Sequence, residues 1–206
     1  MEKVEKIPLG ELFIIKSGAT LTKRYTESAK ARPMQVVKMK HIDHSLGKVD
    51  WGKVEAMALE IPNEDRLLHR SDLLFVAKGD RNTTIPLSNL STDEYAVPSN
   101  HFFILRYKRD WKSRLHLEYV VWYLNEAAQG YFAQQGTGAT VKNISMKVLE
   151  NIEVPLPALQ VQQKIAQTYA LLQQEARDFE ALQGVRKQIL KGVLNKITGD
   201  ETKQKN

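Results

Sequence analysis

The stretch that decides the fold is Ile152–Ile197, IEVPLPALQVQQKIAQTYALLQQEARDFEALQGVRKQILKGVLNKI. It opens with a short apolar segment that contains two prolines, and no proline occurs from Ala158 to the end of the sequence. From Leu159 onward Gln, Glu, Lys, Arg, Ala and Leu predominate, and these residues favour helices. The composition therefore predicts one long C-terminal helix over Leu159–Ile197, about 58 Å long at ~1.5 Å per residue.

Apolar residues recur along this helix at steps of three and four, the heptad spacing of a coiled coil. The spacing shifts near Gln183-Gly184 and then continues. An apolar stripe of this kind packs either on the preceding domain or on a helix of another chain. We favour a second copy, because the preceding 157 residues cannot cover so long a helix along its whole length. The expected dimer interface comprises Ile165, Tyr169, Leu172, Phe179, Leu182, Ile189 and Val193.

Upstream of this helix, short runs of Val, Ile, Phe and Leu alternate with Gly, Pro, Asn and Ser, which indicates strands and loops. One helix, Leu115–Gln129, is expected among them and should stop at Gly130. The expected strands are Leu12–Lys16, Gln35–Met39, Leu73–Ala77, His101–Arg106 and Ile152–Val154. The sequence thus predicts an α+β fold: a mixed β-rich domain (1–157), one long coiled-coil helix (158–198) and a polar tail (199–206).

The composition excludes several classes of protein. None of the 206 residues is cysteine, so disulfides, cysteine zinc sites and thiol nucleophiles are absent. The N-terminus MEKVEKIPLG is charged, and no apolar stretch approaches the ~20 residues of a membrane span. We expect a cytoplasmic protein that does not cross a membrane. The net charge of +6 is compatible with a polyanion partner.

No catalytic motif stands out. Gly136-Thr137-Gly138 lacks the third glycine of a dinucleotide fingerprint, and no P-loop occurs. His41 and His44 lie three residues apart near a strand end, a spacing that puts them on opposite faces and argues against metal ligation. The sequence also lacks a nucleophile elbow. We expect a protein that is not an enzyme and has neither a metal nor a cofactor of its own.

Three loops combine basic residues with turn-forming ones: Lys16–Arg24, Lys78–Thr84 and Gly136–Asn143. Arg reads guanine edges, Asn reads adenine, and Lys and Thr contact the DNA backbone. Each loop alone is also compatible with an ordinary solvated turn. The basic stretch Arg106–Arg114 either contacts phosphates or is a solvated connection. The candidate DNA-binding residues are Lys16, Thr20, Lys23, Arg24, Lys78, Arg81, Asn82, Thr137 and Lys142.

The segment Gly138–Gln167, GATVKNISMKVLENIEVPLPALQVQQKIAQ, resembles the junction between a target recognition domain and a conserved helix in specificity (S) subunits of Type I restriction-modification systems. The resemblance rests on Lys142–Ser145, Leu149, Ile152–Leu159 and Gln162–Ala166. Weaker similarities are Ile7–Leu12 followed by Lys16–Gly18, and Asp72–Gly79. The sequence departs from the family at Val161-Gln162, where Glu-Gln is usual.

The resemblance implies a non-catalytic protein that binds double-stranded DNA. Its partners would be methyltransferase (M) subunits, which bind S-adenosylmethionine, and a restriction (R) subunit, which hydrolyses ATP. A typical S subunit has two recognition domains and two conserved helices, whereas this sequence has one of each. Two copies that pair their long helices antiparallel would recreate that layout as a homodimer, and would recognise a bipartite palindromic site.

One alternative stays open. An S-like regulatory module would dock to M subunits through its helix without specific DNA reading. Sequence-independent DNA binding together with a stable M complex would favour that alternative.

Overall fold

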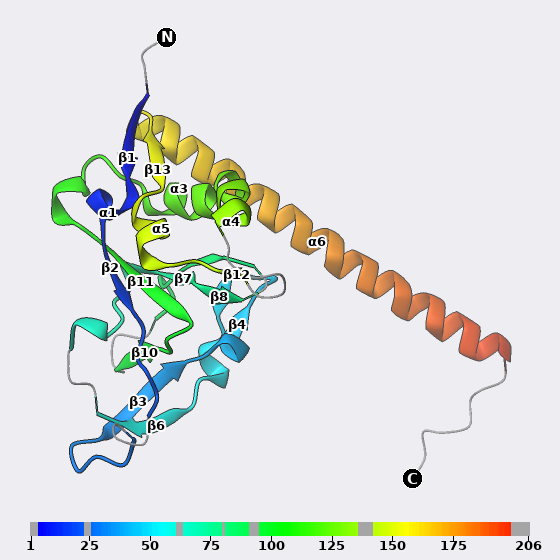
Figure 1. Cartoon of the computed structure of the whole chain (residues 1–206). Helices are drawn as coiled ribbons and strands as arrows, with labels where there is room; N and C mark the ends of the chain where they lie inside the picture. Colours follow the sequence, from blue (N-terminus) through cyan, green and yellow to red (C-terminus); the bar gives the residue numbers. More distant parts are fainter. Residues whose placement is uncertain are drawn as a thin grey trace. The chain divides into compact units, whose positions relative to one another are not determined.

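The computed structural model describes residues 4–22, 26–60, 64–79, 81–90, 95–135 and 142–198, with the backbone alone at Lys142 and Thr198. The chain divides into two compact units, Met1–Ala166 and Gln167–Asn206. The first unit is a mixed β-rich domain, and the long helix α6 (Leu159–Thr198) begins in it (Figure 1). These observations confirm the predicted α+β fold with a long C-terminal helix.

The central sheet of the domain has four antiparallel strands in the order β2-β11-β7-β9. All five residues of β7 are buried, as a continuous apolar run predicts for a strand covered on both faces. The predicted strands of this sheet are confirmed within one residue at each end. Their bounds are β2 Phe13–Ser17, β11 Phe102–Tyr107, β7 Asp72–Val76 and β9 Thr84–Pro86.

Side chains alternate between two hydrophobic cores across this sheet, because successive strand residues point to opposite faces. Leu73 and Phe75 of β7 belong to the core shared with the helices. Leu74 and Val76 belong to the core on the other face. The helices of the first core are α1 (Leu9–Leu12), α3 (Leu117–Trp122), α4 (Gln129–Gln135) and α5 (Met146–Glu150).

The expected helix 115–129 differs in the structure. A π-helical turn, η5 (Tyr123–Ala127), follows α3, and α4 continues through Gly130 as far as Gln135. The predicted stop at Gly130 is therefore wrong. Phe132 explains the continuation, because its buried ring lies 5.2 Å from that of Phe75 in the central sheet. Burial of an aromatic side chain outweighs the modest cost of one glycine in a helix.

A second sheet has the order β10-β3-β6, and β10 runs parallel to β3. Among the described residues, a hairpin and three short 3-10 turns connect the strands of this part of the domain, and a fourth turn, η4, follows β11 of the central sheet, where Trp111 packs on the first core. The bounds are β3 Arg32–Val37, β6 Ala56–Leu59, β10 Ala96–Pro98, β4 Ile42–Asp43, β5 Lys48–Val49, η1 Met39–His41, η2 Trp51–Lys53, η3 Glu64–Arg66 and η4 Arg109–Trp111.

The beginning and the end of the domain pair with each other. Strand β1 (Glu5–Pro8) lies antiparallel to β13 (Glu153–Leu156), with Ile7 opposite Val154. The Leu9 amide extends the pairing by donating to the Ile152 carbonyl at 2.9 Å. Two of the stretches that resemble the S-subunit family are thus spatial neighbours.

The first turns of α6 belong to the domain. Gln162 is buried; its amide nitrogen donates to the Arg114 and Pro157 carbonyls, and its side-chain oxygen accepts from the His116 amide. Val161, where the family usually has a carboxylate, is exposed. This explains why the loss of that carboxylate is tolerated.

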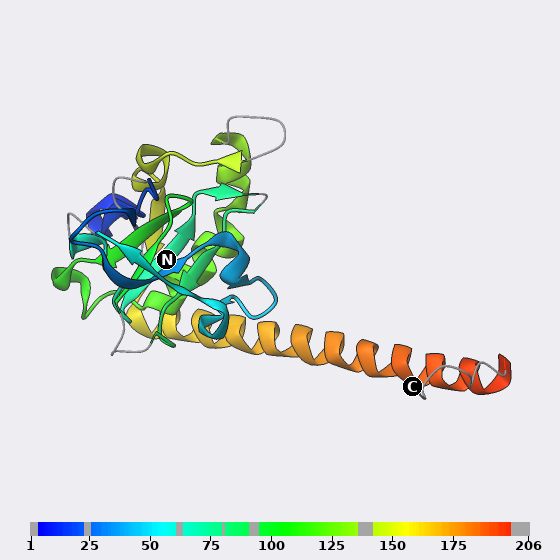
Figure 2. The same cartoon turned by 90° about the horizontal axis from the view of Figure 1, so that it is seen from below.

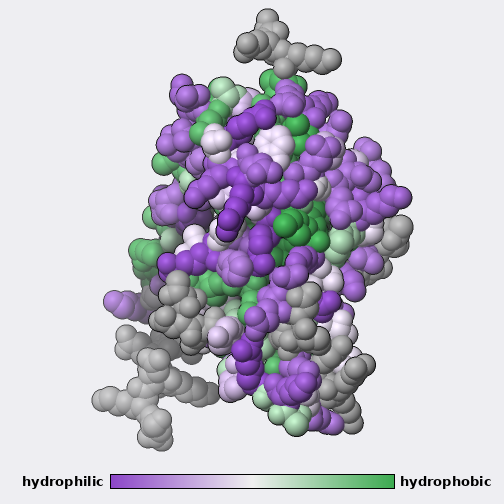
Figure 3. All heavy atoms as spheres, turned by 90° about the vertical axis from the view of Figure 1, so that its left-hand side faces the viewer, coloured by the Kyte–Doolittle hydropathy of each residue, from purple (hydrophilic) through white to green (hydrophobic). Residues whose placement is uncertain are grey.

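In the second unit α6 is a continuous helix through Gly184, so the shift in the heptad spacing does not interrupt it (Figures 1 and 2). Large apolar side chains along it are exposed, among them Leu172, Phe179 and Ile189 at 57%, 60% and 62%. By contrast, the face of the molecule in Figure 3 is mostly hydrophilic. Within the described ranges, no helix combines the length and apolar composition that a membrane crossing requires.

Candidate nucleic-acid interface

A tight turn between β10 and β11, residues 99–102, is the point on which the candidate loops converge. The Ser99 amide donates to the Val37 carbonyl at 2.8 Å, and the Phe102 amide donates to the Ser99 carbonyl at 3.1 Å. The His101 carbonyl accepts from the amides of Ala77, at 2.8 Å, and Lys78. Backbone bonds to strand ends on two sides therefore fix the turn.

The first predicted loop is attached to this turn through Gly18. The Gly18 amide donates to the Phe102 carbonyl, and the next amide, of Ala19, donates to the Pro98 carbonyl at 2.7 Å. A Cβ atom at Gly18 would lie only 2.1 Å from the Ser99 carbonyl oxygen, so this approach of two backbones requires glycine. The contact brings Thr20 beside the turn.

The second and third predicted loops meet in a short antiparallel pair. Strand β8 (Lys78–Gly79) lies opposite β12 (Lys142–Asn143). The Ile144 amide then donates to the Ala77 carbonyl at 2.9 Å, and Ile144 is buried. Three loops that are far apart in the sequence therefore share one edge of the domain. We call the described segments 16–21, 38–40, 78–79, 81–82 and 99–101 the recognition edge.

Side chains from the helical layer hold the loop between β8 and β9. Asn125, in the π-helical turn, accepts from the Thr84 amide at 2.6 Å and donates to the Thr84 carbonyl at 3.0 Å, as a neighbouring strand would. Gln129 donates to the Asn82 carbonyl at 2.9 Å. Two buried or partly buried side-chain amides, those of Asn125 and Gln129, thus hold the loop that carries Arg81 against the helices.

The predicted DNA-binding residues occupy different environments. Thr20, Lys78 and Arg81 are exposed on the recognition edge. Lys16 is half-buried and forms an ion pair with Asp65 at 2.5 Å. Asn82 is buried, and its amide donates to the Val76 carbonyl at 2.9 Å, so this side chain shapes the loop from inside. Lys23, Arg24, Thr137 and the side chain of Lys142 lie outside the described residues.

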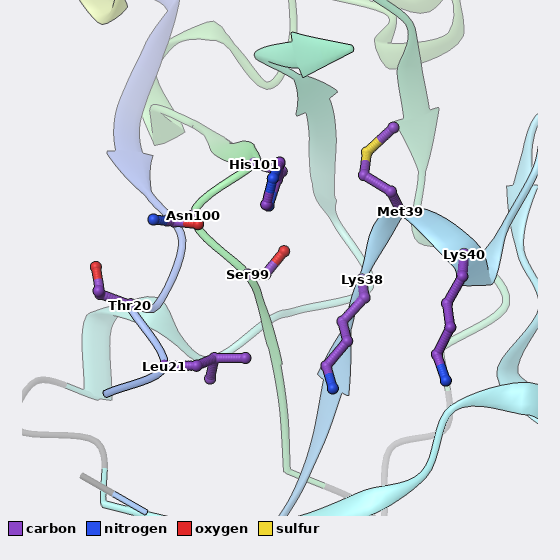
Figure 4. Close-up of a pocket in the computed structure, with 8 residues that line it drawn as sticks. All are labelled: Thr20, Leu21, Lys38, Met39, Lys40, Ser99, Asn100 and His101. Carbon is purple, nitrogen blue, oxygen red and sulfur yellow. The ribbon is translucent and has the colours of Figure 1, made fainter. Parts of the chain in front are cut away.

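A cleft of about 410 Å³ opens in the recognition edge (Figure 4). Lys38, Met39 and Lys40 line one side, Thr20 and Leu21 line the other, and the turn lies between them. Sequence reasoning missed Lys38, Lys40, Asn100 and His101. The available signals were the basic run Lys38-Met39-Lys40 at the end of a strand and the polar triplet Ser99-Asn100-His101 before another strand.

The charges next to the cleft favour the binding of a negatively charged ligand. Burial lowers the pKa of His41, and the neighbouring Lys40 and Lys38 lower it further. The neutral ring accepts a hydrogen bond at Nδ1 from the Lys38 amide, at 3.1 Å. The described residues contain no group of three or more His, Asp and Glu side chains placed to hold a metal ion. The cleft thus offers cationic and neutral polar groups of the kind that contact phosphates and bases.

Much of the basic stretch 106–114 is engaged within the domain. Arg106 pairs with the buried Asp72, and Lys108 donates from Nζ to the Gly10 carbonyl at 2.9 Å. Arg114 pairs with Glu5 and lies over the ring of Trp111. These contacts favour a structural role for this stretch over phosphate binding.

The predicted dimer residues divide between the two units. Ile165 packs against the hydrophobic core of the domain. Tyr169 is partly buried, whereas Leu172, Phe179, Leu182, Ile189 and Val193 are exposed. The apolar stripe available to a partner therefore begins beyond the first turns of α6.

Comparison with known proteins supplies the family. The family model of the Type I restriction modification DNA specificity domain matches residues 1–189. The comparison with curated proteins gave no match.

Solved structures share the fold at low identity. An S subunit of a Type I system from M. genitalium is 14% identical, with a TM-score of 0.57 over 98% of this chain and 48% of that chain. The HsdS subunit of Thermoanaerobacter tengcongensis is 17% identical, with a TM-score of 0.61 over 89% and 40%. A chain described in work on complex assembly of the type I R-M system is 16% identical, with a TM-score of 0.59 over 94% and 44%.

This chain spans less than half the length of each of these three proteins. Their likeness establishes the fold, and the family model, which covers all of the first unit and more than half of the second, establishes the relationship. The chain belongs to the family of Type I restriction-modification DNA specificity domains.

Proposed function

We propose that this chain is a sequence-specific DNA-binding subunit of a Type I restriction-modification system and that it contacts double-stranded DNA through the recognition edge. The observation that carries the proposal is the match of the specificity-domain family over residues 1–189. The convergence of three candidate loops on one edge supports it, because a duplex is contacted by several segments at once.

The exposed side chains of the edge have the chemistry that DNA requires. Lys78 and Thr20 contact the sugar-phosphate backbone, and Arg81 reads a guanine edge through its planar guanidinium. Asn82, being buried, keeps Arg81 in place through the Val76 carbonyl. If their side chains join this surface, Lys23, Arg24, Thr137 and Lys142 add further phosphate or base contacts.

The proposed subunit catalyses no reaction and uses no cofactor. Methyl transfer, DNA cleavage and ATP hydrolysis belong to M and R subunits, which this chain positions on the DNA. The support for these partners is membership of the specificity family. The cytoplasm, where such partners and DNA occur together, is the proposed location.

The proposed assembly is a homodimer formed by antiparallel pairing of α6. Its support is the run of exposed apolar side chains from Leu172 to Val193, which would gain stability by burial against a second helix. A two-fold axis between the copies would place one recognition edge on each half of a bipartite, palindromic site.

DNA selection tests the function. The full chain is incubated with a random duplex library, and bound sequences are recovered and compared. We expect a defined sequence to be enriched and Arg81→Ala to relax the preference at one guanine, whereas Arg109→Ala, a change of an exposed arginine away from the edge, leaves the preference intact. Enrichment of no sequence would overturn the proposal, and a stable M complex from the same preparation would then favour a docking module.

Light scattering tests the assembly. The wild-type chain should have the mass of a dimer, and Leu172→Asp should give a monomer because it buries a charge without a partner. Gln167→Asp, an exposed polar position on another face of the helix, is the matched control and should stay dimeric. A Leu172→Asp chain with the wild-type mass would contradict pairing through this stripe.

A further inference from the structure

The turn 99–101 presents side chains on a backbone that is already fixed. Residues on both sides of Asn100 have their backbone groups bonded to strand ends, at Val37 and at Ala77. Asn100 and His101 are nevertheless exposed, and both line the cleft of about 410 Å³. A rigid backbone that carries exposed polar side chains is what a base-reading element needs, because little conformational entropy is lost on binding.

The Asn100 carboxamide has no hydrogen-bond partner in the part of the chain that the structure describes. Three other asparagines of the domain differ from it: Asn82, Asn89 and Asn125 all donate to backbone carbonyls. A carboxamide has one acceptor and one donor side by side. That pair matches the N6 donor and N7 acceptor of adenine in the major groove.

Lys38 and Lys40 complete the arrangement. Both line the same cleft as Asn100, and Figure 4 shows their side chains extending in the same direction. Neither lysine has an ion-pair partner among the residues described. Two ammonium groups without carboxylate partners, in the cleft that Asn100 also lines, are suited to the phosphates that flank a contacted base.

We infer that the cleft of the recognition edge holds one strand of the DNA duplex, with Asn100 reading an adenine edge and Lys38 and Lys40 binding adjacent phosphates. The inference rests on the proposed function and specifies which residues determine sequence and which determine affinity. None of these three residues belongs to the loops that the sequence pointed to. The parallel pairing of β10 with β3 brings them together, with Pro98 opposite Val37.

The test uses the DNA selection on the full chain, now with variants of the cleft. Asn100→Ala should bind the wild-type target about tenfold to a hundredfold more weakly and accept other bases at one adenine, with every other position of the target unchanged. Asn100→Asp exchanges the donor for a second acceptor. It should shift the preference at that position from adenine to cytosine, whose N4 amino group donates. A new preference cannot arise from a variant that fails to fold.

The lysines have a different expected signature. The double variant Lys38→Ala/Lys40→Ala should bind all duplexes more weakly by a similar factor. The slope of the logarithm of its binding constant against the logarithm of the salt concentration should be less steep, by the amount that about two phosphate contacts contribute. Asn151→Ala and Lys112→Ala/Lys147→Ala, all exposed and outside the edge, are the matched controls. They should retain the wild-type target and salt slope.

The outcomes separate the inference from the function on which it rests. If the wild-type chain selects a sequence and Asn100→Ala and Asn100→Asp select the same one with the same affinity, the assignment of Asn100 is overturned while DNA reading stands. An unchanged salt slope in the lysine double variant overturns the phosphate contacts. If the wild-type chain selects no sequence, both the function and this inference fall.

Discussion

Asp72 of β7 and Arg106 of β11 lie opposite each other and form a bidentate ion pair. Arg106 Nε donates to Oδ1 at 2.9 Å, and the terminal guanidinium nitrogen donates to Oδ2 at 2.7 Å. Asp72 is fully buried, and Oδ2 also accepts from the His69 amide. The hydrogen bonds that Arg106 donates to Asp72 raise the pKa of Arg106. The aspartate that opens the Asp72–Gly79 motif is thus a structural residue of the central sheet.

Removal of this carboxylate should destabilise the domain. Asp72→Asn leaves the guanidinium without its counter-charge, and we expect the free energy of unfolding to fall by about 3 kcal/mol. Urea denaturation followed by circular dichroism measures the loss. Glu5→Gln, which breaks the exposed pair with Arg114, is the control and should cost less than about 1 kcal/mol. Equal losses in the two variants would contradict a special role for the buried pair.

The amide of Asn125 should be necessary for the order of the loop that carries Arg81. Asn125→Ala leaves the Thr84 amide and carbonyl without their partners and should lower the free energy of unfolding by about 2 kcal/mol. Hydrogen exchange locates the effect, because the Thr84 amide should exchange faster than in the wild type. Gln135→Ala, at the exposed end of α4, should leave that exchange rate unchanged. Protection of Thr84 in the Asn125 variant would refute the pairing.

Two glycines should respond to alanine with opposite signs. Gly18→Ala drives a methyl group against the Ser99 and Pro98 carbonyl oxygens and should destabilise the domain by about 1 to 3 kcal/mol. Gly130→Ala, in α4, meets open space and removes a flexible residue from a helix, so it should stabilise by about 0.5 to 1 kcal/mol. Thermal unfolding of both variants checks the contrast, and a stabilised Gly18→Ala would show that the two backbones are not in contact.

Acid should weaken the fold through His41. The pKa of His41 in the folded domain is lowered from 6.5 by burial, then by Lys40 and Lys38, so below pH 6.5 the unfolded chain binds the proton more readily. The contribution of the neutral ring to stability is therefore complete above pH 6.5 and decreases as the pH falls. Urea denaturation from pH 7.5 to 5 should show a smaller loss for His41→Gln than for the wild type. The same loss in both would exclude His41 as the cause.

Periodicity and composition predicted the parts of the fold that depend on local sequence. The run Leu73–Ala77 is apolar throughout and became a strand buried on both faces, and the heptad spacing after Leu159 became a continuous helix. Gly130 shows the limit of such reasoning. Whether a glycine ends a helix depends on what the next residues bury, and the contact of Phe132 with Phe75 joins segments that are 57 positions apart.

The candidate site was predictable only in part for the same reason. Arg81 and Asn82 are neighbours in a polar loop, yet one is exposed and the other is buried against Val76. Composition alone does not distinguish them. Lys38 and Asn100 line one cleft because of a parallel pairing of strands about 60 residues apart, for which no short motif exists.

The pairing of β1 with β13 has an evolutionary consequence. Because Ile7 lies opposite Val154, the chain enters and leaves the β-rich domain at one place. A genetic crossover could therefore replace the whole segment between these two strands and leave its connection to the helix unchanged. Segments whose two ends lie close together generally tolerate such an exchange. Under the proposed function, such an exchange would change the target preference of the chain and leave the helix proposed for dimer formation unchanged.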